Sequence, residues 1–387
     1  MARKRICHVI TDLDIGGAEM MLYRLLSKFH HPSCSHSVIS LLPPGKLLEP
    51  YGKTGTAVYS LGLTRRGLSI PAAFSRFLRI ITFLQPDIIQ GWMYHGNLAA
   101  SLAGLFPSIH SRVVWNIRQS LYSLNAEKPL TALLIRLGAW ISSRVDQVIY
   151  NSTISLRQHS GIGYAESNSA ILYNGFDTDR FHPDDVAGDY LRQSLGLEKD
   201  ALLVGLMGRF HPMKDHETFF KAASRLRQDC PAVRFVLAGK GIEKTNRALF
   251  TLVEAAGVAD HTCLLGERED MPHIHAAMDI ATSSSWAEGF PNVIGEAMSC
   301  GIPCVVTDVG DSAHLVGNTG MVVPARNPEA LFQAWKTMIG LSRKSRLELG
   351  KAARKRIQSN FDIGVVAKRY ETLYQNILAI PGTGSTG

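Results

Sequence analysis

Residues 5–29, RICHVITDLDIGGAEMMLYRLLSKF, define how the fold of this chain begins. The first six residues are an apolar run with β-branched side chains, which is typical of a buried strand. A polar loop with Gly16 and Gly17 follows this run. The next residues fit one face of a helix, which carries Met20, Leu22, Leu25 and Leu26. A strand, a glycine turn and a helix in this order open a doubly wound α/β domain.

The same alternation continues along the chain. Further strand-like runs in the first half lie at 36–42, 57–63, 87–92, 112–118 and 147–152. Residues 171–183, ILYNGFDTDRFHP, are rich in turn residues and are expected to form a linker. A second series of strand-like runs follows at 202–210, 233–241, 262–266, 279–285, 303–310 and 319–324. Helical stretches separate most of these runs, which predicts two parallel sheets covered by helices.

The length of 387 residues allows two domains of ordinary size. We expect the first domain over residues 1–175 and the second over residues 176–363. A helix at 364–380 is expected to pack back on the first domain, and the tail 381–387 to be disordered. Ligands of such sheets bind beyond the carboxyl ends of the strands, so two facing sheets would form one cleft.

The composition excludes several classes of protein. Hydrophobic residues make up 45% and charged residues 19%, which is ordinary for a soluble α/β protein. The six cysteines form no Cys-x-x-Cys pair, so zinc and thioredoxin-type sites have little support, and reduced thiols suit the cytoplasm. The first apolar run is too short for a signal peptide, and polar residues interrupt the uncharged run 88–111. We therefore expect a cytoplasmic protein.

The positive charge is concentrated in the first half of the chain. Residues 1–175 contain 17 Lys and Arg against 8 Asp and Glu, a balance of +9, so the total of +8 leaves −1 for the remainder. A basic first domain indicates an anionic partner there, such as a phospholipid surface or a lipid phosphate. A merely solvated basic surface is the alternative. Interleaved aromatic and basic segments are not evident, so we expect no nucleic acid.

The segment 208–220, GRFHPMKDHETFF, places two cations near a helix start. Arg209 follows a glycine that ends a strand, and Lys214 comes five residues later. A guanidinium fork, a point charge and helix N-terminal amides together suit a diphosphate. Two solvated cations are the alternative on this segment alone.

The segment 288–301, EGFPNVIGEAMSCG, places two carboxylates around another helix start. Pro291 fits the first helical position and Gly301 the position after the helix end, so Glu296 lies one turn into the helix. Carboxylates only accept hydrogen bonds, so Glu288 and Glu296 suit the paired hydroxyls of a sugar or a ribose. The amides at the helix start favour a phosphate.

These motifs resemble, in order, those of the retaining GT-B glycosyltransferases of family four, also called glycosyltransferase group one. The most specific is Glu-x7-Glu in EGFPNVIGEAMSCGIPCVVTDVG. GGAEMML, NGFDTDRFHP, GRFHPMKDHETF and LAGKG also match the family in the right order. The resemblance covers nearly the whole chain. It implies a GT-B fold, in which two Rossmann-like doubly wound domains face each other across a cleft.

The resemblance also implies a reaction. The first domain would bind the acceptor and the second a nucleotide sugar, whose hexose or N-acetylhexosamine would be transferred with retained anomeric configuration. Arg209 and Lys214 would bind the diphosphate and stabilise the leaving group, so that neither metal nor cofactor is needed. Glu288 would contact the transferred sugar and Glu296 the ribose. UDP is the commoner donor nucleotide in this family, and GDP remains open.

Further donor contacts follow from the resemblance. Gly16 and Gly17 would let the first loop approach the phosphates. The base would lie near Leu265, Gly266 and Arg268. The sugar and phosphate pocket would be lined by Gly289, Phe290, Pro291 and Asn292.

The sequence departs from the family at some positions. Many members carry a histidine at the end of the fifth strand of the first domain, where this chain has Arg118. We expect Arg118 and His95 to be the polar candidates near the transferred sugar, although a lone histidine is often structural. The pair Asp12 and Asp14 is similar to the metal motif of the other glycosyltransferase fold, but it lies in the wrong loop, so we expect no metal.

The acceptor is predicted from the basic first half. Residues 71–84 carry Arg76 and Arg79 among apolar residues, and residues 130–144 carry Arg136, Arg144 and Trp140. Such helices can rest on anionic bilayers, so we expect a glycan or polyprenyl-linked glycan acceptor in cell-surface polysaccharide or glycolipid synthesis, with the enzyme peripheral on the cytoplasmic face. Core helices with solvated arginines are the alternative.

Three other functions are alternatives to a retaining glycosyltransferase. An NAD-type dehydrogenase would need Gly-x-Gly-x-x-Gly after the first strand, which the chain lacks. A non-catalytic nucleotide-sugar-binding protein remains an alternative, although the intact arginine, lysine and two glutamates argue against it. A glycogen-synthase-like enzyme with a soluble glucan acceptor is the other alternative.

Overall fold

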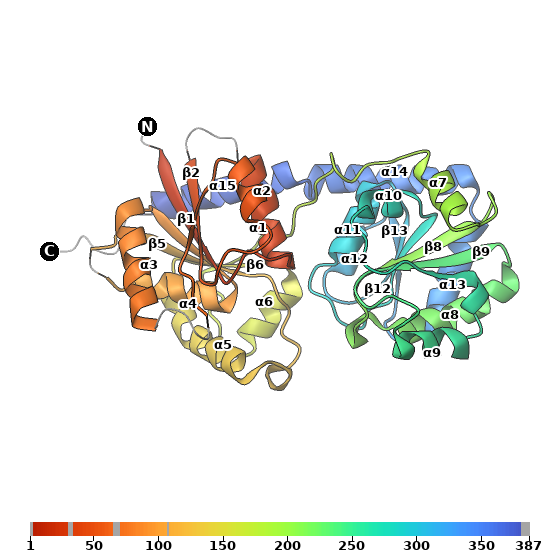
Figure 1. Ribbon diagram of the computed structural model, residues 1–387, viewed down its shortest axis with the longest axis horizontal. Helices are drawn as coiled ribbons and strands as arrows, with labels where there is room; N and C mark the ends of the chain where they lie inside the picture. Colours follow the sequence, from red (N-terminus) through yellow and green to blue (C-terminus); the bar gives the residue numbers. More distant parts are fainter. Residues whose placement is uncertain (1–2, 30–33, 65–69, 107, 381–387) are drawn as a thin grey trace. The chain divides into compact units, whose positions relative to one another are not determined.

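The computed structural model describes residues 3–29, 34–64, 70–106 and 108–380 of the chain. These residues form two compact units (Figure 1). Unit 1 comprises Met1–Gly175 and Ile363–Gly387, and unit 2 comprises Phe176–Asp362. The predicted disordered tail 381–387 lies outside the described residues.

The described part of unit 1 forms a parallel sheet of seven strands, in the order β3-β2-β1-β4-β5-β6-β7. β1 occupies a central position, where Cys7 pairs with Ser37 of β2 and with Ile89 of β4. The strands are β1 (Lys4–Ile10), β2 (Cys34–Ser40), β3 (Ala57–Ser60), β4 (Ile88–Trp92), β5 (Arg112–Ile117), β6 (Gln147–Tyr150) and β7 (Ser169–Ile171).

Helices cover both faces of this sheet, each over its own hydrophobic core. One core joins the sheet to α1, α2 and α15, and the other joins it to α3, α4 and α5. The elements between the strands and after them are α1 (Gly17–Lys28), α2 (Leu48–Lys53), α3 (Ile70–Leu84), α4 (Met93–Gly104), η1 (Leu124–Ala126), α5 (Pro129–Ile141), η2 (Ser142–Arg144), α6 (Thr153–Ser160) and α15 (Ile363–Ala379).

Unit 2 forms a parallel sheet of six strands, in the order β10-β9-β8-β11-β12-β13. The order reverses between β8 and β11, and the carboxyl ends of strands at such a switch point are the usual place for a ligand. The strands are β8 (Leu202–Met207), β9 (Val233–Ala238), β10 (Thr262–Leu264), β11 (Ile280–Ser283), β12 (Cys304–Thr307) and β13 (Gly320–Val323).

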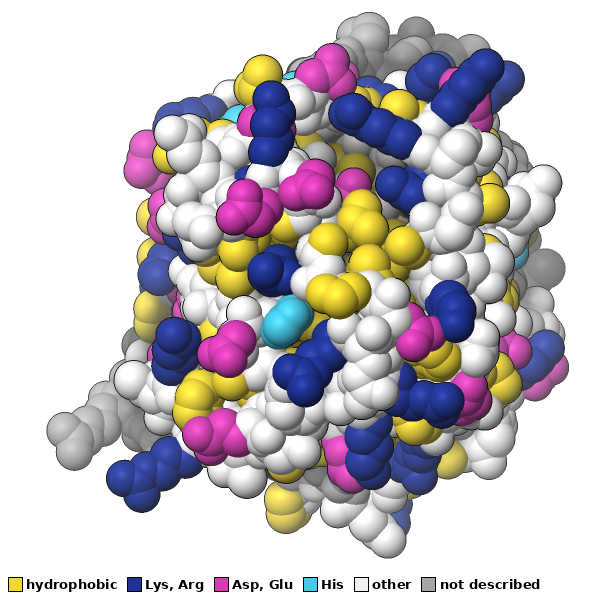
Figure 2. Space-filling model, turned by 90° about the vertical axis from the view of Figure 1, so that its right-hand side faces the viewer, with side chains coloured by type: hydrophobic (Ala, Val, Ile, Leu, Met, Phe, Trp, Pro, Cys, Tyr) yellow, Lys and Arg dark blue, Asp and Glu magenta, His cyan; other side chains and the backbone are white. Residues whose placement is uncertain are grey.

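The core of unit 2 is largest between the sheet and α8, α9 and α13, where the buried rings of Phe219, Phe235 and Trp335 meet edge to face or tilted. On the surface that Figure 2 views, side chains of both charge signs are interspersed. The helices are α7 (Ala187–Ser194), η3 (Pro212–Lys214), α8 (His216–Asp229), α9 (Arg247–Ala255), η4 (Ala259–His261), α10 (Met271–Ala276), α11 (Asn292–Ser299), α12 (Ser312–Val316), α13 (Pro328–Gly340) and α14 (Arg343–Asn360).

The predicted fold class, two doubly wound parallel sheets, is confirmed. Among the described residues, the one strand that the sequence did not reveal is β7, whose three residues are only half buried and whose last residue is the first of the predicted linker. So short a run carries no readable period. In the part of the chain that the structure describes, no helix is both long and apolar enough to cross a membrane.

Candidate functional site

A single 3-10 turn, η3, follows β8 and carries Lys214 as its last residue. Before the turn, the His211 ring accepts a hydrogen bond from the Met213 N–H at 3.2 Å. After it, Asp215 adopts a left-handed conformation with φ of 48°, and its carboxylate caps α8 by accepting from the Thr218 N–H at 3.1 Å. The turn is therefore held at both ends, which fixes the backbone from which the lysine side chain extends.

The loop between β11 and α11 is bound to this turn. The Ser284 hydroxyl donates to the Lys214 carbonyl at 2.8 Å, and the Trp286 N–H donates to the Met213 carbonyl at 3.0 Å. The Trp286 indole N–H donates to the Pro212 carbonyl at 2.9 Å. These three bonds connect the ends of β8 and β11, which are neighbours in the sheet.

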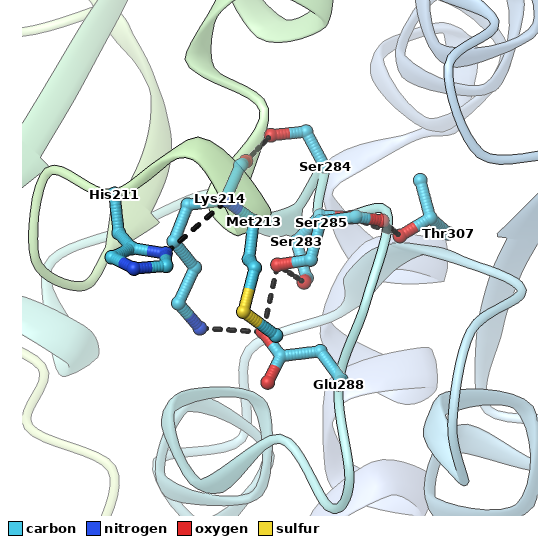
Figure 3. Close-up of polar contacts among 8 residues, drawn as sticks. All are labelled: His211, Met213, Lys214, Ser283, Ser284, Ser285, Glu288 and Thr307. Carbon is cyan, nitrogen blue, oxygen red and sulfur yellow. Dashed lines mark hydrogen bonds and ion pairs between the residues drawn. The ribbon is translucent and has the colours of Figure 1, made fainter. Parts of the chain in front are cut away.

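Lys214 and Glu288 meet at this junction (Figure 3). The lysine ammonium lies 2.5 Å from Glu288 Oε1, and the Ser285 hydroxyl donates to the same oxygen at 2.7 Å. Thr307, at the end of β12, supports the loop by donating to the Ser285 carbonyl at 2.5 Å. The lysine and glutamate side chains keep 21% and 14% of their surface exposed, so the ion pair is partly desolvated and still reachable by a ligand.

A third loop, after β12, closes against the backbone around Glu288. Gly310 has a φ of 56°, and a Cβ there would lie 2.3 Å from the Glu288 carbonyl oxygen. Only glycine fits this contact. The next N–H, of Asp311, donates to the Gly289 carbonyl at 3.0 Å. The loops after β8 and β12 thus both contact the loop after β11 at Glu288, the first through the carboxylate and the second through the backbone.

Phe290, which the resemblance places in the lining of the sugar and phosphate pocket, has a buried side chain. Its side chain is 6% exposed, stacks on Phe176 with ring centroids 6.0 Å apart, and lies 5.7 Å from the Phe361 ring. Gly295 permits this packing, because a Cβ there would lie 2.0 Å from the Phe176 ring. The buried ring of Phe290 therefore anchors the start of α11 in the core.

The limits of α11 differ slightly from those predicted. The helix begins at Asn292, so Pro291 is the N-cap residue and not the first helical residue. Pro291 is buried and Asn292 half buried. At the other end Cys300 is the C-cap and Gly301 follows with φ of 75°, as the predicted left-handed glycine requires.

Glu296 is the fifth residue of α11, and its carboxylate faces a buried histidine. Its Oε2 is 3.8 Å from His275 Nε2, and the histidine is 1% exposed. Neither ring nitrogen of His275 has a hydrogen-bond partner among the described residues. Burial lowers the pKa of His275, and the charge of Glu296 opposes this shift. The imidazole is therefore neutral at pH 7 and faces a carboxylate.

The remaining unit 2 candidates follow β8 and β10. Arg209 is exposed, one residue after Gly208. Leu265 is half buried, and Gly266 is buried with φ of 70°. Arg268 is exposed and forms a two-point ion pair with Asp270, at 2.8 and 2.6 Å. These residues belong to the same edge of the sheet as Lys214 and Glu288, because all of them follow parallel strands.

Arg118 in unit 1 is bonded entirely to protein groups. Its Nε donates to Asn174 Oδ1 at 3.0 Å, and Nη1 donates to Asn116 Oδ1 at 3.0 Å and to the Tyr370 hydroxyl at 2.9 Å. Its Nη2 donates to the Leu172 carbonyl at 3.4 Å and also to Asn174. These five bonds match the five donors of a guanidinium, so the geometry favours a structural role for this residue.

The other unit 1 candidates lie at helix starts. Gly16 is the N-cap of α1, where a Cβ would lie 2.2 Å from the Glu19 carboxylate, whereas Gly17 is exposed with open space around it. His95 lies in the first turn of α4 and is half buried, and burial lowers its pKa.

Asp12 and Asp14 are used within their own loop. Asp12 accepts a hydrogen bond from the Asp14 N–H at 3.0 Å, and Asp14 accepts one from the Lys46 N–H at 3.3 Å. Among the residues that the structure describes, no group of three histidine, cysteine, aspartate or glutamate side chains could hold a metal ion.

Sequence reasoning missed several residues of this site. Ser284 and Ser285 bind Lys214 and Glu288, Thr307 supports their loop, and His275 faces Glu296. No sequence motif gave any of these four a role, although Thr307 stands within the quoted segment 288–310. The available signal was the run of three serines directly after a buried strand, because small hydroxyl side chains at a strand end suit a hydrogen-bonded loop.

Comparisons with known proteins place most of the chain in glycosyltransferase families. Residues 201–340 match the family described as Glycosyl transferases group 1, and residues 15–180 match Glycosyltransferase Family 4. A putative glycosyltransferase, EpsF of Bacillus subtilis, is 25% identical over 79% of this chain and 80% of its own length. A UDP-Gal:α-D-GlcNAc-diphosphoundecaprenol α-1,3-galactosyltransferase of Escherichia coli is 32% identical over 38% of this chain and 39% of its own length.

Solved structures share the whole fold. The Anabaena protein HepE, in complex with UDP and glucose, superposes with a TM-score of 0.81 at 20% identity, over 97% of this chain and all of the other. The sucrose-phosphate synthase of Thermosynechococcus elongatus superposes with a TM-score of 0.80 at 18% identity, over 97% of this chain and all of the other.

Proposed function

The chain belongs to the group 1 and family 4 glycosyltransferases and has their GT-B fold, and we propose that it moves a hexose or N-acetylhexosamine from a UDP-sugar to a glycan or lipid-linked acceptor. The proposed transfer retains the anomeric configuration, as the resemblance to the retaining enzymes implies. The observation that carries the proposal is the contact of Lys214 with Glu288 at the carboxyl ends of β8 and β11.

The two charges suit the two halves of a sugar diphosphate. In the proposed reaction the bond from sugar C1 to the β-phosphate oxygen breaks, and its electron pair leaves with UDP. The acceptor oxygen bonds to C1 on the same face, and its proton passes to the departing diphosphate. Lys214 and the exposed Arg209 would stabilise the charge that develops on that leaving group.

Glu288 would bind the sugar that is transferred. Its carboxylate already accepts hydrogen bonds from Lys214 and Ser285, which fix its orientation before a ligand arrives. Fixed acceptors of this kind bind vicinal hydroxyls without a reorganisation cost. Because Lys214 and Glu288 are in contact, a phosphate bound by the lysine would lie next to the carboxylate. The donor requires this closeness, since its sugar is bonded directly to the diphosphate.

Glu296 would accept hydrogen bonds from the ribose hydroxyls. His275, which faces this carboxylate, is neutral, so it does not neutralise the charge with which Glu296 would bind the ribose. UDP is preferred over GDP in this proposal because the Escherichia coli relative uses a UDP-sugar and the Anabaena neighbour binds UDP.

Calorimetric titration of UDP and GDP into wild type and Glu296→Ala tests the donor site. We expect UDP to bind and the substitution to weaken it about tenfold or more, the loss expected for a hydrogen bond to a charged group. Equal binding of UDP by the variant would refute the ribose site. NMR of the product anomer would then decide retention, since an inverted product contradicts it.

The proposed reaction needs no metal cofactor. Lys214 and Arg209 supply the positive charge that a divalent ion provides in other sites. Activity should therefore persist in excess EDTA. A loss that Mn²⁺ or Mg²⁺ restores would contradict this part of the proposal.

A lipid-linked acceptor is supported by a surface on unit 1. The outer side of α5 exposes Leu133 by 53%, Leu137 by 42% and Trp140 by 69%, at positions one or two turns apart. Arg136 is exposed on the same side, and the guanidinium of Arg144 lies over the Trp140 ring at 4.5 Å. A stripe of apolar side chains flanked by cations suits the surface of an anionic bilayer.

The E. coli relative, which acts on a diphosphoundecaprenol-linked sugar, supports the same class of acceptor. We therefore place the enzyme on the cytoplasmic face of the membrane in polysaccharide or glycolipid synthesis. Flotation with anionic vesicles should recover the wild type but not Leu133→Glu/Trp140→Glu, whereas Leu347→Glu, exposed on α14 of unit 2, should float as the wild type does. Wild type that fails to float would refute membrane binding without affecting the UDP result.

A further inference from the structure

Unit 2 carries a pocket of about 500 Å³ whose lining includes neither Lys214 nor Glu288. Its lining includes Pro212 of η3 and residues at the starts of α8 and α13. Pockets of this size accommodate one small ligand. The side chains that decide its chemistry are Asp215, His216, Glu217, Lys221, Trp286 and Arg326.

Two strained residues line this pocket. Among the described residues, four that are not glycine have positive φ, and two of these are Asp215 at 48° and Arg326 at 56°. Such conformations persist only where the surroundings enforce them, and they cluster at ligand sites. Their occurrence in the lining of one pocket points to a built site.

The strained arginine covers an aromatic ring. The Arg326 guanidinium lies 4.9 Å from the centre of the Trp286 ring, and the Trp286 indole N–H is fixed to the Pro212 carbonyl at 2.9 Å. The ring therefore has a set orientation. A fixed indole edge or face offers a large apolar contact area at low entropic cost.

The pocket also contains a buried histidine. His216 is 3% exposed, and its Nε2 has no hydrogen-bond partner among the described residues. Burial, reinforced by the charge of Lys214, lowers the pKa of His216 to about 4, so the ring is neutral at pH 7. The histidine therefore adds no charge to this wall of the pocket.

The charges that line the pocket balance. Two carboxylates, of Asp215 and Glu217, face two cations, of Lys221 and Arg326, and the net lining charge is zero. Glu217 and Lys221 form an ion pair at 2.6 Å. An anionic ligand would meet both carboxylates, and an apolar one would desolvate all four charges. A neutral ligand with many hydroxyls uses donors, acceptors and the aromatic ring together.

We propose that this pocket binds a neutral saccharide unit of a glycan at a second site outside the donor site. The choice of a glycan as the ligand rests on the proposed function, whereas the existence of the pocket is independent of it. Its wall is continuous with the donor site, because the Trp286 N–H donates to the Met213 carbonyl beside Lys214. A saccharide bound here would hold the glycan near the turn that carries the catalytic lysine.

Saturation-transfer NMR tests the site with four probes: maltose, cellobiose, lactose and N,N′-diacetylchitobiose. We expect transfer to at least one of them, unchanged when UDP saturates the donor site. Absence of transfer to all four would overturn the proposal. Displacement of the sugar by UDP would also overturn it, because the sugar would then occupy the donor site.

Arg326→Gly removes the guanidinium and adopts positive φ without strain, so the variant should fold. It should weaken the sugar by about tenfold and leave UDP affinity unchanged. Lys336→Ala, an exposed residue of α13 paired with Asp229, is the matched control and should bind both as the wild type does. Sugar binding unchanged in Arg326→Gly would refute the site. Failure of the wild type to bind UDP would instead refute the proposed donor site.

Discussion

Unit 1 and unit 2 share one topology but use the polar side chains at their strand ends differently. In unit 1, Arg118 after β5 directs all five of its hydrogen bonds to protein atoms, including the Tyr370 hydroxyl of α15. In unit 2, Lys214 and Glu288 bind each other and remain partly exposed. The same edge of the same fold is thus internally satisfied in one unit and available to a ligand in the other.

This difference in hydrogen bonding distinguishes strand-end groups that stabilise the fold from those that can contact a ligand. Unit 1 uses polar groups in its strands and at their ends to attach a helix that arrives late in the sequence. Arg118 after β5 binds Tyr370, and Gln90 in the middle of β4 accepts a hydrogen bond from the Tyr374 hydroxyl at 2.5 Å. Unit 2 uses them to align a cation with a carboxylate. A polar residue at a strand end is therefore no sufficient sign of catalysis, and its partners must be known.

The strongest way to break this comparison is Lys214→Ala. We expect the rate of sugar transfer to fall about 10²–10³-fold, because in the proposed reaction Lys214 stabilises the charge of the leaving group. Steady-state kinetics against Lys351→Ala, an exposed lysine paired with Glu348, provide the measurement and its control. A loss of less than tenfold would place the catalytic charge elsewhere.

Arg118→Met tests the unit 1 side. The variant removes the hydrogen bonds that Arg118 donates to the Asn116 and Asn174 side-chain oxygens, so we expect a loss of about 1–3 kcal/mol in the free energy of unfolding. UDP affinity should not change. Arg144→Met, whose side chain is exposed, should have nearly wild-type stability. Lost activity at full stability would instead show that Arg118 acts on the substrate.

Acid should weaken the unit 1 core. Burial lowers the pKa of His36 to about 4, whereas an unfolded histidine titrates near 6.5. Between these two pKa values the unfolded state binds a proton and the folded state does not. The free energy of unfolding is therefore unaffected by His36 above about pH 6.5 and falls as the pH decreases towards 4. Thermal unfolding from pH 7.5 to 5 measures the slope.

His36→Phe should flatten this slope, since Phe29 already stacks on the ring at 4.4 Å. His182→Gln, at an exposed position, should leave the slope unchanged. A slope unaffected by His36→Phe would mean that other groups cause the acid sensitivity.

The smallest effect is expected for Gly17→Ala. An added Cβ meets no atom within 4 Å, so the variant should be as stable as the wild type or slightly more so. If this loop approaches the donor phosphates, the KM for the donor rises while the melting temperature does not fall. Gly52→Ala in α2 has equally open surroundings and should alter neither. An unchanged KM in Gly17→Ala would remove the first loop from the donor site.

The sheets could be predicted because their strands are long apolar runs between turns. The start and end of α11 could be placed within one residue, since glycine at the C′ position has a conformational cause. The contact of Lys214 with Glu288 could not be predicted, because 74 residues separate them and only the adjacency of β8 and β11 brings them together. The burial of Phe290 was missed for the same reason, since its neighbours Phe176 and Phe361 lie far away in the sequence.

The position of α15 at the end of the chain decides the order in which the two units can complete their folding during synthesis. The chain completes unit 2 at Asp362 before the residues of α15 leave the ribosome, and unit 1 must wait for them. Until then the sites for Tyr370 and Tyr374, both buried in the finished fold, remain open on a nascent first half. The domain that starts first is thus finished last, so a truncation after residue 362 should spare unit 2 and expose the core of unit 1 to proteases and chaperones.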